Sequence, residues 1–150
     1  MMHMQHTAPA PTPTPCACTA LRKATRLITR RYDERLAPHA MTTTQFALLR
    51  HIARAGEIGL SQLAEQLVMD RTSLYRCLRP AEAAGWVATR PAPRGHVRLA
   101  SLTEAGRAAM HAATPAWEAC QAEIRAGLGE AGWQGLFGAA QAVLALGAAA

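Results

Sequence analysis

The sequence has few aromatic residues, few acidic residues and no long hydrophobic run. Phe, Trp and Tyr make up 5% of the 150 residues, and 10 Asp and Glu stand against 16 Lys and Arg. No stretch approaches the roughly 18 apolar residues that a membrane-spanning helix needs. The first residues lack the basic segment and apolar core of a secretory signal. We therefore expect a cytoplasmic protein whose four cysteines are thiols.

The sequence also lacks the motifs that would indicate an enzyme. Its histidines show no metal-binding spacing such as HExxH, and it has no glycine-rich phosphate loop. Ser61, Ser73 and Ser101 lie in no nucleophile elbow. A nucleophile also needs a positioned base and an orienting partner. We therefore expect no catalysis, no bound metal and no other cofactor.

The charge that is present is basic and unevenly distributed. The net charge is +6 and the pI is about 9.9, so a polyanionic partner is plausible on charge alone. Between residues 60 and 103, six arginines stand against three carboxylates, which places half of the net charge in under a third of the chain. Arginine suits contacts to phosphates and bases because its planar guanidinium donates two hydrogen bonds at once.

Residues 58–103 predict two short helices joined by a sharp turn. Apolar residues recur along one face of the first helix at Leu60, Leu63, Ala64 and Leu67. Asp70 can cap the second helix. The second helix would bury Leu74, Leu78 and Ala81, and Pro80 predicts a kink or an early end.

The other side of the second helix carries the side chains that a reader of the DNA major groove needs. These are Arg71, Thr72, Ser73, Tyr75, Arg76 and Arg79. Arginine can bind guanine through two hydrogen bonds, and hydroxyls can reach phosphates or base edges. On the first helix, Ser61 and Gln62 are expected to hold the DNA backbone, and the Ser61 hydroxyl can also cap backbone N–H groups.

A β-hairpin is predicted after Gly85. Its strands are the runs 86–90 and 97–102, and the segment between them is broken by Pro and Gly and carries Arg94. Arg98 lies at the start of the second strand. A basic hairpin beside a helix-turn-helix forms a winged helix, whose tip reaches the minor groove or the DNA backbone. The alternative is a winged helix that binds another protein and no DNA.

Helical periodicity flanks this unit on both sides. One helix starts at Cys16 and ends before Pro38, and another covers 41–54. After a cap at Thr103, a further helix is expected to bend or restart near Pro115 and to break at Gly127 and Gly129. The last segment is strongly apolar on one face, which predicts a partner helix from a second subunit.

The run LSQLAEQLVMDRTSLYRCLRPAEAAGWV, followed by SLTEAGR, resembles the MarR family of bacterial regulators. The resemblance covers roughly residues 18–147. It implies a homodimer that represses by occupying a palindromic operator, with residues 16–40 and 104–150 as dimerisation helices. We therefore expect a disordered Pro-rich tail over 1–15 and a single domain over 16–150. Its fold would be mainly α with a small β-hairpin wing, a winged helix-turn-helix over 58–103.

Two cysteines suggest a signal for such a regulator. Cys16 and Cys18 lie where the first helix begins, and a helix N-terminus favours the thiolate. The stretch from Cys18 to Tyr32 resembles the peroxide-sensing OhrR branch of the family, which implies oxidation of Cys18 with support from Tyr32. The alternatives are a Cu(I), As(III) or Zn(II) site at the Cys-X-Cys pair, or cysteines with no sensory role. Cys77 and Cys120 are expected to be small buried residues.

If the cysteines are inert, the resemblance implies a small aromatic acid or phenol as the ligand. Its pocket would lie between the dimer helices and the winged helix. The residues that we expect to line it are Arg22, Arg26, Met41 and His51. In either case the signal would change the spacing of the two reading helices and release the DNA.

Overall fold

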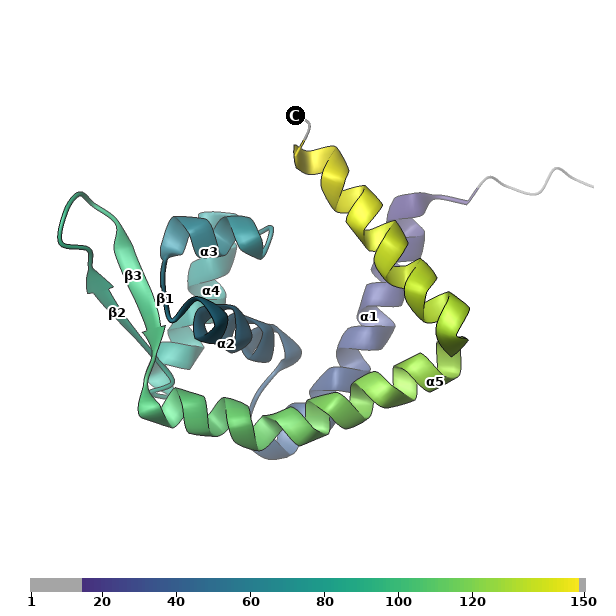
Figure 1. The fold of residues 1–150 in the computed structure, drawn as a ribbon, viewed down its shortest axis with the longest axis horizontal. Coiled ribbons are helices and arrows are strands. Elements are labelled where there is room, and N and C mark those ends of the chain that lie inside the picture. Colours follow the sequence, from purple (N-terminus) through teal and green to yellow (C-terminus); the bar gives the residue numbers. More distant parts are fainter. Residues whose placement is uncertain (1–14, 149–150) are drawn as a thin grey trace, which may run out of the picture.

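The computed structural model describes residues 15–148, so the predicted tail lies outside the described residues except for its last residue. The elements are α1 (Ala17–Leu36), the 3-10 turn η1 (Ala37–His39), α2 (Thr43–Ala55), β1 (Glu57–Gly59), α3 (Leu60–Gln66), α4 (Arg71–Ala83), β2 (Val87–Pro91), β3 (Arg98–Leu102) and α5 (Glu104–Ala148). In Figure 1, α2, α3, α4 and the sheet form one body, and α1 and α5 extend from it as long arms. The predicted fold class, mainly α with a β wing, is confirmed. None of the helices described is apolar enough over a sufficient length to span a membrane.

The core lies where α2, α3, α4 and the sheet meet. The predicted apolar faces of α3 and α4 are both turned into it, and Leu63, Leu74 and Leu78 are almost fully buried. From α2, the side chains of Phe46, Leu48, Leu49 and Ile52 fill its centre. Full burial of a large aliphatic side chain stabilises a fold by about 1.5–3 kcal/mol, so these residues hold the helix-turn-helix as one rigid unit.

The sheet has one strand more than the hairpin that we predicted. The hairpin forms as expected, with Val87 paired to Leu102 across β2 and β3. β1 adds a third strand, in the order β1-β3-β2, with Ile58 opposite Ala100. Three residues are too few to show a strand periodicity, and this segment is extended because β3 offers its free edge. The sequence predicted no strand in this segment.

Neither proline ends its helix, so the early end predicted at Pro80 and the restart predicted near Pro115 do not occur. α4 continues through Pro80 to Ala83, and α5 continues through Pro115. A proline in a helix costs about 3 kcal/mol. Burial on both sides of each proline opposes this cost, because Leu78 and Ala81 flank one, and Ala113 and Cys120 flank the other.

The break predicted at Gly129 is confirmed. Its φ of 69° and ψ of 169° lie outside the helical region. In Figure 1, α5 turns at this point and its yellow C-terminal half leads away from the first half. Glycine accepts this conformation without the steric cost that a side chain would add.

A tight junction joins the end of α4, the start of the wing and the start of α5. The Thr103 N–H donates to the carbonyl of Trp86 at 3.0 Å, and the Thr103 hydroxyl donates to the carbonyl of Gly85. The same hydroxyl accepts from the N–H of Gly106 at 3.0 Å, which confirms Thr103 as the cap. A Cβ at Gly106 would lie 2.0 Å from the Trp86 carbonyl oxygen, so only glycine lets the two backbones approach this closely.

We expect Gly106→Ala to lower the free energy of unfolding by at least about 2 kcal/mol, because the clash is with backbone and forces α5 away from Trp86. Urea unfolding followed by circular dichroism measures this. Gly127→Ala is the matched control, since nothing lies within 4 Å of a Cβ at that position. The control should match or exceed wild type by up to about 1 kcal/mol, as expected for Gly→Ala in a helix. Equal stability of both variants would contradict the close contact.

Candidate nucleic-acid interface

The turn between α3 and α4 is closed by backbone hydrogen bonds at the end of α3. The N–H of Met69 donates to the carbonyl of Ala64 at 2.9 Å, and that of Val68 to the carbonyl of Glu65 at 3.1 Å. This pattern needs a left-handed residue, and Val68 takes that conformation with φ of 53°. α3 begins directly after β1, with Gly59 in the capping position and no side-chain cap. Ser61 is therefore no cap and presents an exposed hydroxyl from within the helix.

Asp70 caps α4, as predicted. Its carboxylate accepts from the Ser73 N–H at 2.7 Å and from the Ser73 hydroxyl at 3.1 Å. These two hydrogen bonds hold the pKa of Asp70 below its usual value. They also engage the Ser73 hydroxyl, which leaves Ser73 less available for DNA than its exposed neighbours.

The face of α4 opposite the core carries cations without neutralising partners. Arg71, Thr72, Arg76 and Arg79 are exposed, and Tyr75 is half-buried beside them. Within residues 15–148, none of these arginines has a carboxylate within ion-pair distance. The positive charge on this helix is therefore free to meet an external anion.

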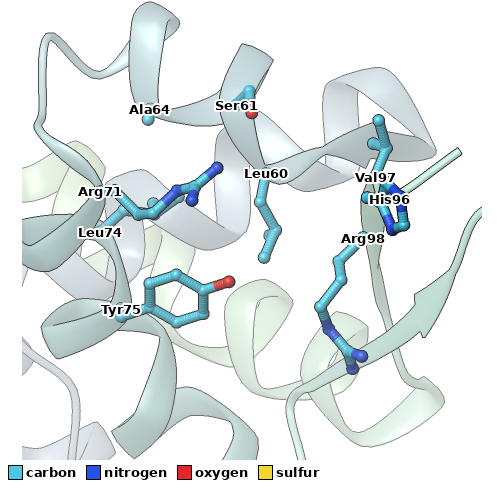
Figure 2. Close-up of a pocket in the computed structure, with 9 residues that line it drawn as sticks. All are labelled: Leu60, Ser61, Ala64, Arg71, Leu74, Tyr75, His96, Val97 and Arg98. Atoms are coloured by element: carbon cyan, nitrogen blue, oxygen red, sulfur yellow. The ribbon is translucent and has the colours of Figure 1, made fainter.

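A cavity of about 500 Å³ separates this face from the wing, and Figure 2 shows its lining. Arg71 and Tyr75 enter it from α4, and the Tyr75 hydroxyl points toward its centre. Ser61 borders it from α3, and His96 and Arg98 border it from the hairpin. The structure thus brings together predicted contacts from three elements. His96 was not among the predicted contacts, although its place in the hairpin tip was visible in the sequence.

The cations of the wing differ in how free they are. Arg90 forms two hydrogen bonds to Glu57, of 2.6 and 2.9 Å, which join β2 to the segment before α3. Arg94 is exposed at the tip, and Arg98 is exposed at the start of β3. Gln62, the residue after Ser61 on α3, is also exposed. Among the wing arginines Arg90, Arg94 and Arg98, Arg90 is thus the one that is neutralised. The sequence pattern does not distinguish it from the other two.

Comparison with known proteins gives consistent matches. The MarR family model matches residues 41–94, which span α2, α3, α4 and the first part of the hairpin. The transcriptional regulator MosR of M. tuberculosis, solved in complex with DNA, is 31% identical over 90% of this chain and 98% of its own, with a TM-score of 0.82. The chain belongs to the MarR family.

Two further structures agree with this assignment. A second structure of MosR is 34% identical, covers 87% of this chain and 96% of its own, and has a TM-score of 0.72. A mutant MarR of E. coli, solved with operator DNA, is 25% identical, covers 85% of this chain and 92% of its own, and has a TM-score of 0.77. No curated protein matches the sequence. The chain is thus a MarR-family transcriptional regulator with a winged-helix DNA-binding fold.

In this MarR-family chain, Cys16 and Cys18 lie at the exposed start of α1. Cys16 occupies the capping position, where the N–H and hydroxyl of Thr19 and the N–H of Cys18 lower the pKa of its thiol, and it makes no side-chain capping hydrogen bond. The resemblance to the OhrR branch pointed instead to Cys18. No group of three or more potential metal ligands converges anywhere in the described chain, so the Cys-X-Cys pair has no third ligand there.

Tyr32 lies far from Cys18 within one chain. Fourteen residues of helix separate them, which is about 21 Å at ~1.5 Å per residue. Tyr32 instead packs with Cys120 and Ile124, and its hydroxyl donates to Gln121. Burial raises the pKa of Tyr32 to about 12, and burial also raises the pKa of the Cys120 thiol. Cys120 is buried as predicted and is held as an unreactive thiol, while Cys77 is only half-buried.

The residues expected to line a ligand pocket do not converge within one chain. Arg22 and Arg26 are exposed on α1, Met41 is buried in the core, and the His51 ring bonds to the carbonyl of Ala47 at 2.8 Å. Sequence reasoning missed Arg50, which lies on α2 where that helix contacts α5. Arg50 stacks over the Trp117 ring at 4.1 Å. The available signal was an arginine one helical turn after Phe46.

The cap at Asp70 makes the folding of α4 depend on pH. Its pKa is lowered in the folded state, so its stabilising contribution is present above the unfolded pKa of about 3.9. That contribution is lost as pH falls through the folded value. At pH 7 we expect Asp70→Ala to lower the urea midpoint and Asp70→Asn to preserve most of it, because Asn is also a good cap. The advantage of wild type over Asp70→Ala should shrink as pH falls from 4 to 2, and a constant difference would contradict the cap.

Proposed function

We propose that this chain is a homodimeric repressor that binds a palindromic operator, with α4 in the major groove and the wing on the DNA backbone. The observation that supports it best is the exposed arginine face of α4, whose charge no carboxylate in the described chain neutralises. Arg76, Thr72 and Tyr75 would read base edges, and Arg71, Arg79, Ser61 and Gln62 would hold phosphates. We assign the protein to the cytoplasm, where operator DNA lies, and assign it no enzymatic activity.

The proposed dimer rests on apolar side chains along both arms. Leu21, Leu27, Phe137 and Leu144 are each about half exposed, and Leu146 is 74% exposed. Such a concentration of apolar surface on helices outside the body favours burial against a second copy. Residues 16–40 and 104–150 would then form the dimer, and 58–103 the DNA-binding unit. Two α4 helices about 34 Å apart would meet half-sites one helical turn apart.

We expect Arg76→Ala to weaken binding to a duplex from the region upstream of its own gene by at least about tenfold, because each good base contact contributes roughly 1–3 kcal/mol. Fluorescence anisotropy over a range of salt concentrations measures this, and wild-type binding should weaken steeply with salt. Arg90→Ala is the matched control, since Glu57 already neutralises that arginine. A protein-interaction module would show no salt-dependent binding in any variant. Wild-type affinity in Arg76→Ala would contradict the proposed reading face.

The signal that would release the DNA has two candidates, and the first is a small aromatic acid. Arg50 is half-buried beside the paired rings of Phe46 and Trp117, where α2 contacts α5, and its guanidinium lies closer to Trp117. Trp117 also touches the cluster around Tyr32 and Cys120. An aromatic carboxylate bound there would pair with Arg50 and contact both the arms and the body. Arg22, Arg26 and His51 would join such a site only in the dimer.

The second candidate is an oxidant that acts on Cys16 and Cys18, supported by their exposure and by the lowered pKa of Cys16. The Cys16 thiolate would attack a peroxide oxygen to give a sulfenic acid and an alcohol. The Cys18 thiol would then displace water to form a disulfide. Cys16 occupies the capping position of α1 in an extended conformation, and Cys18 lies in the first turn of the helix. A disulfide between them would distort that first turn and disturb the dimer.

A peroxide titration separates the two signals. If the cysteines sense the oxidant, cumene hydroperoxide should release wild type from DNA and leave Cys16→Ser bound, and dithiothreitol should restore wild-type binding. Cys77→Ser is the matched control and should respond like wild type, because Cys77 is outside this pair. Release of both Cys16→Ser and Cys18→Ser at the wild-type dose would contradict the oxidant signal and leave the aromatic acid as the proposed one.

A further inference from the structure

The wing contains a chain of hydrogen bonds that leads from α4 to Arg98. The Thr89 hydroxyl on β2 donates to a carboxylate oxygen of Glu82 on α4 at 2.8 Å. The same hydroxyl accepts from the Nη2 of Arg98 on β3 at 2.9 Å. Thr89 thus uses both hydrogen-bonding roles of its hydroxyl, and three elements meet at one oxygen atom.

The register of the sheet explains why these residues meet. Thr89 is opposite Ala100 and Arg98 is opposite Pro91, so Thr89 and Arg98 lie on the same face of the hairpin. Ala100 is fully buried, which shows that this face is turned toward the core and α4. Arg98 is located where the face leaves the core, and its side chain borders the cavity that Arg71 and Tyr75 enter from α4.

Arg98 is held in place without being neutralised. Its direct partner is a neutral hydroxyl, and in the described chain no carboxylate lies within ion-pair distance of it. Arg90 differs, because it donates two hydrogen bonds to Glu57, whose carboxylate neutralises most of its charge. Glu82 has no other hydrogen-bond partner among the side chains described, and a carboxylate near a helix C-terminus is unfavourable on its own. Its placement is explained by the hydrogen bond from Thr89.

We propose that Glu82 and Thr89 are positioning residues that orient the Arg98 guanidinium across the groove between α4 and the wing, so that it meets a DNA phosphate without a direct ion-pair partner of its own. This inference rests on the proposed DNA-binding function. An arginine ordered before binding loses less side-chain entropy on forming the contact. Arg98 therefore contributes more than Arg94, which stands exposed at the tip with no such support.

The test is a double-mutant cycle on binding to the same upstream duplex. We expect Arg98→Ala to raise Kd about tenfold and Thr89→Val about fivefold, with Thr89→Ser close to wild type because it keeps the hydroxyl. In the Arg98→Ala background, Thr89→Val should have no further effect. Thr89→Val combined with Arg94→Ala, the matched control cycle, should give additive losses. Both Thr89→Val and Arg98→Ala should also reduce the salt slope by about one per half-site.

Several outcomes would overturn the inference while leaving the proposed function intact. One is Thr89→Val adding its full loss to Arg98→Ala, and another is an unchanged salt slope in Thr89→Val, since either would indicate a merely structural role. Wild-type binding by Arg98→Ala, with Arg76→Ala still weakened, would also overturn it. Wild-type binding by both arginine variants would instead contradict the proposed DNA interface itself. Circular dichroism confirms that every variant compared is folded.

Discussion

The burial of one side of α4 is the constraint on which the rest of the interface depends. Leu74, Leu78 and Ala81 are almost completely removed from solvent, against α2, α3 and the sheet. Because these residues recur every three to four positions, their burial determines the rotation of the helix about its own axis. The arginines on the opposite side are then exposed together and in a defined direction. The same burial keeps α4 helical through Pro80.

The position of α4 relative to the arms is set by the junction at Trp86. The hydrogen bonds of Thr103 and the bare backbone of Gly106 attach the first turn of α5 to the turn that ends α4. A movement of α5 therefore reaches α4 through backbone contacts, without passing through flexible side chains. A few turns further along α5, Trp117 stacks with Arg50 of α2. A displacement of α5 at either place can therefore shift α4.

The distribution of charge in the wing follows from which residues pair with carboxylates. Glu57 on β1 pairs with Arg90 on β2 and links these two strands of the sheet. Glu82 is connected to Arg98 only indirectly, because both form hydrogen bonds with the Thr89 hydroxyl. Arg90 thus stabilises the sheet, and the other arginines of the hairpin remain available to an external anion. Counting basic residues overstates the charge available to DNA for this reason.

The helix-turn-helix and the hairpin could be predicted from local sequence patterns, because each is encoded by residues close together in the chain. The apolar spacing of α3 and α4, the Asp70 and Thr103 caps and the stop at Gly85 involve residues only a few positions apart. The tertiary structure alone decided the third strand, since Ile58 is extended only because β3 lies beside it. It also decided that helices pass through Pro80 and Pro115, that Tyr32 packs on Cys120 and not near Cys18, and that Arg98 is oriented while Arg90 is neutralised. Each of these depends on a partner distant in sequence, whose identity no local pattern contains.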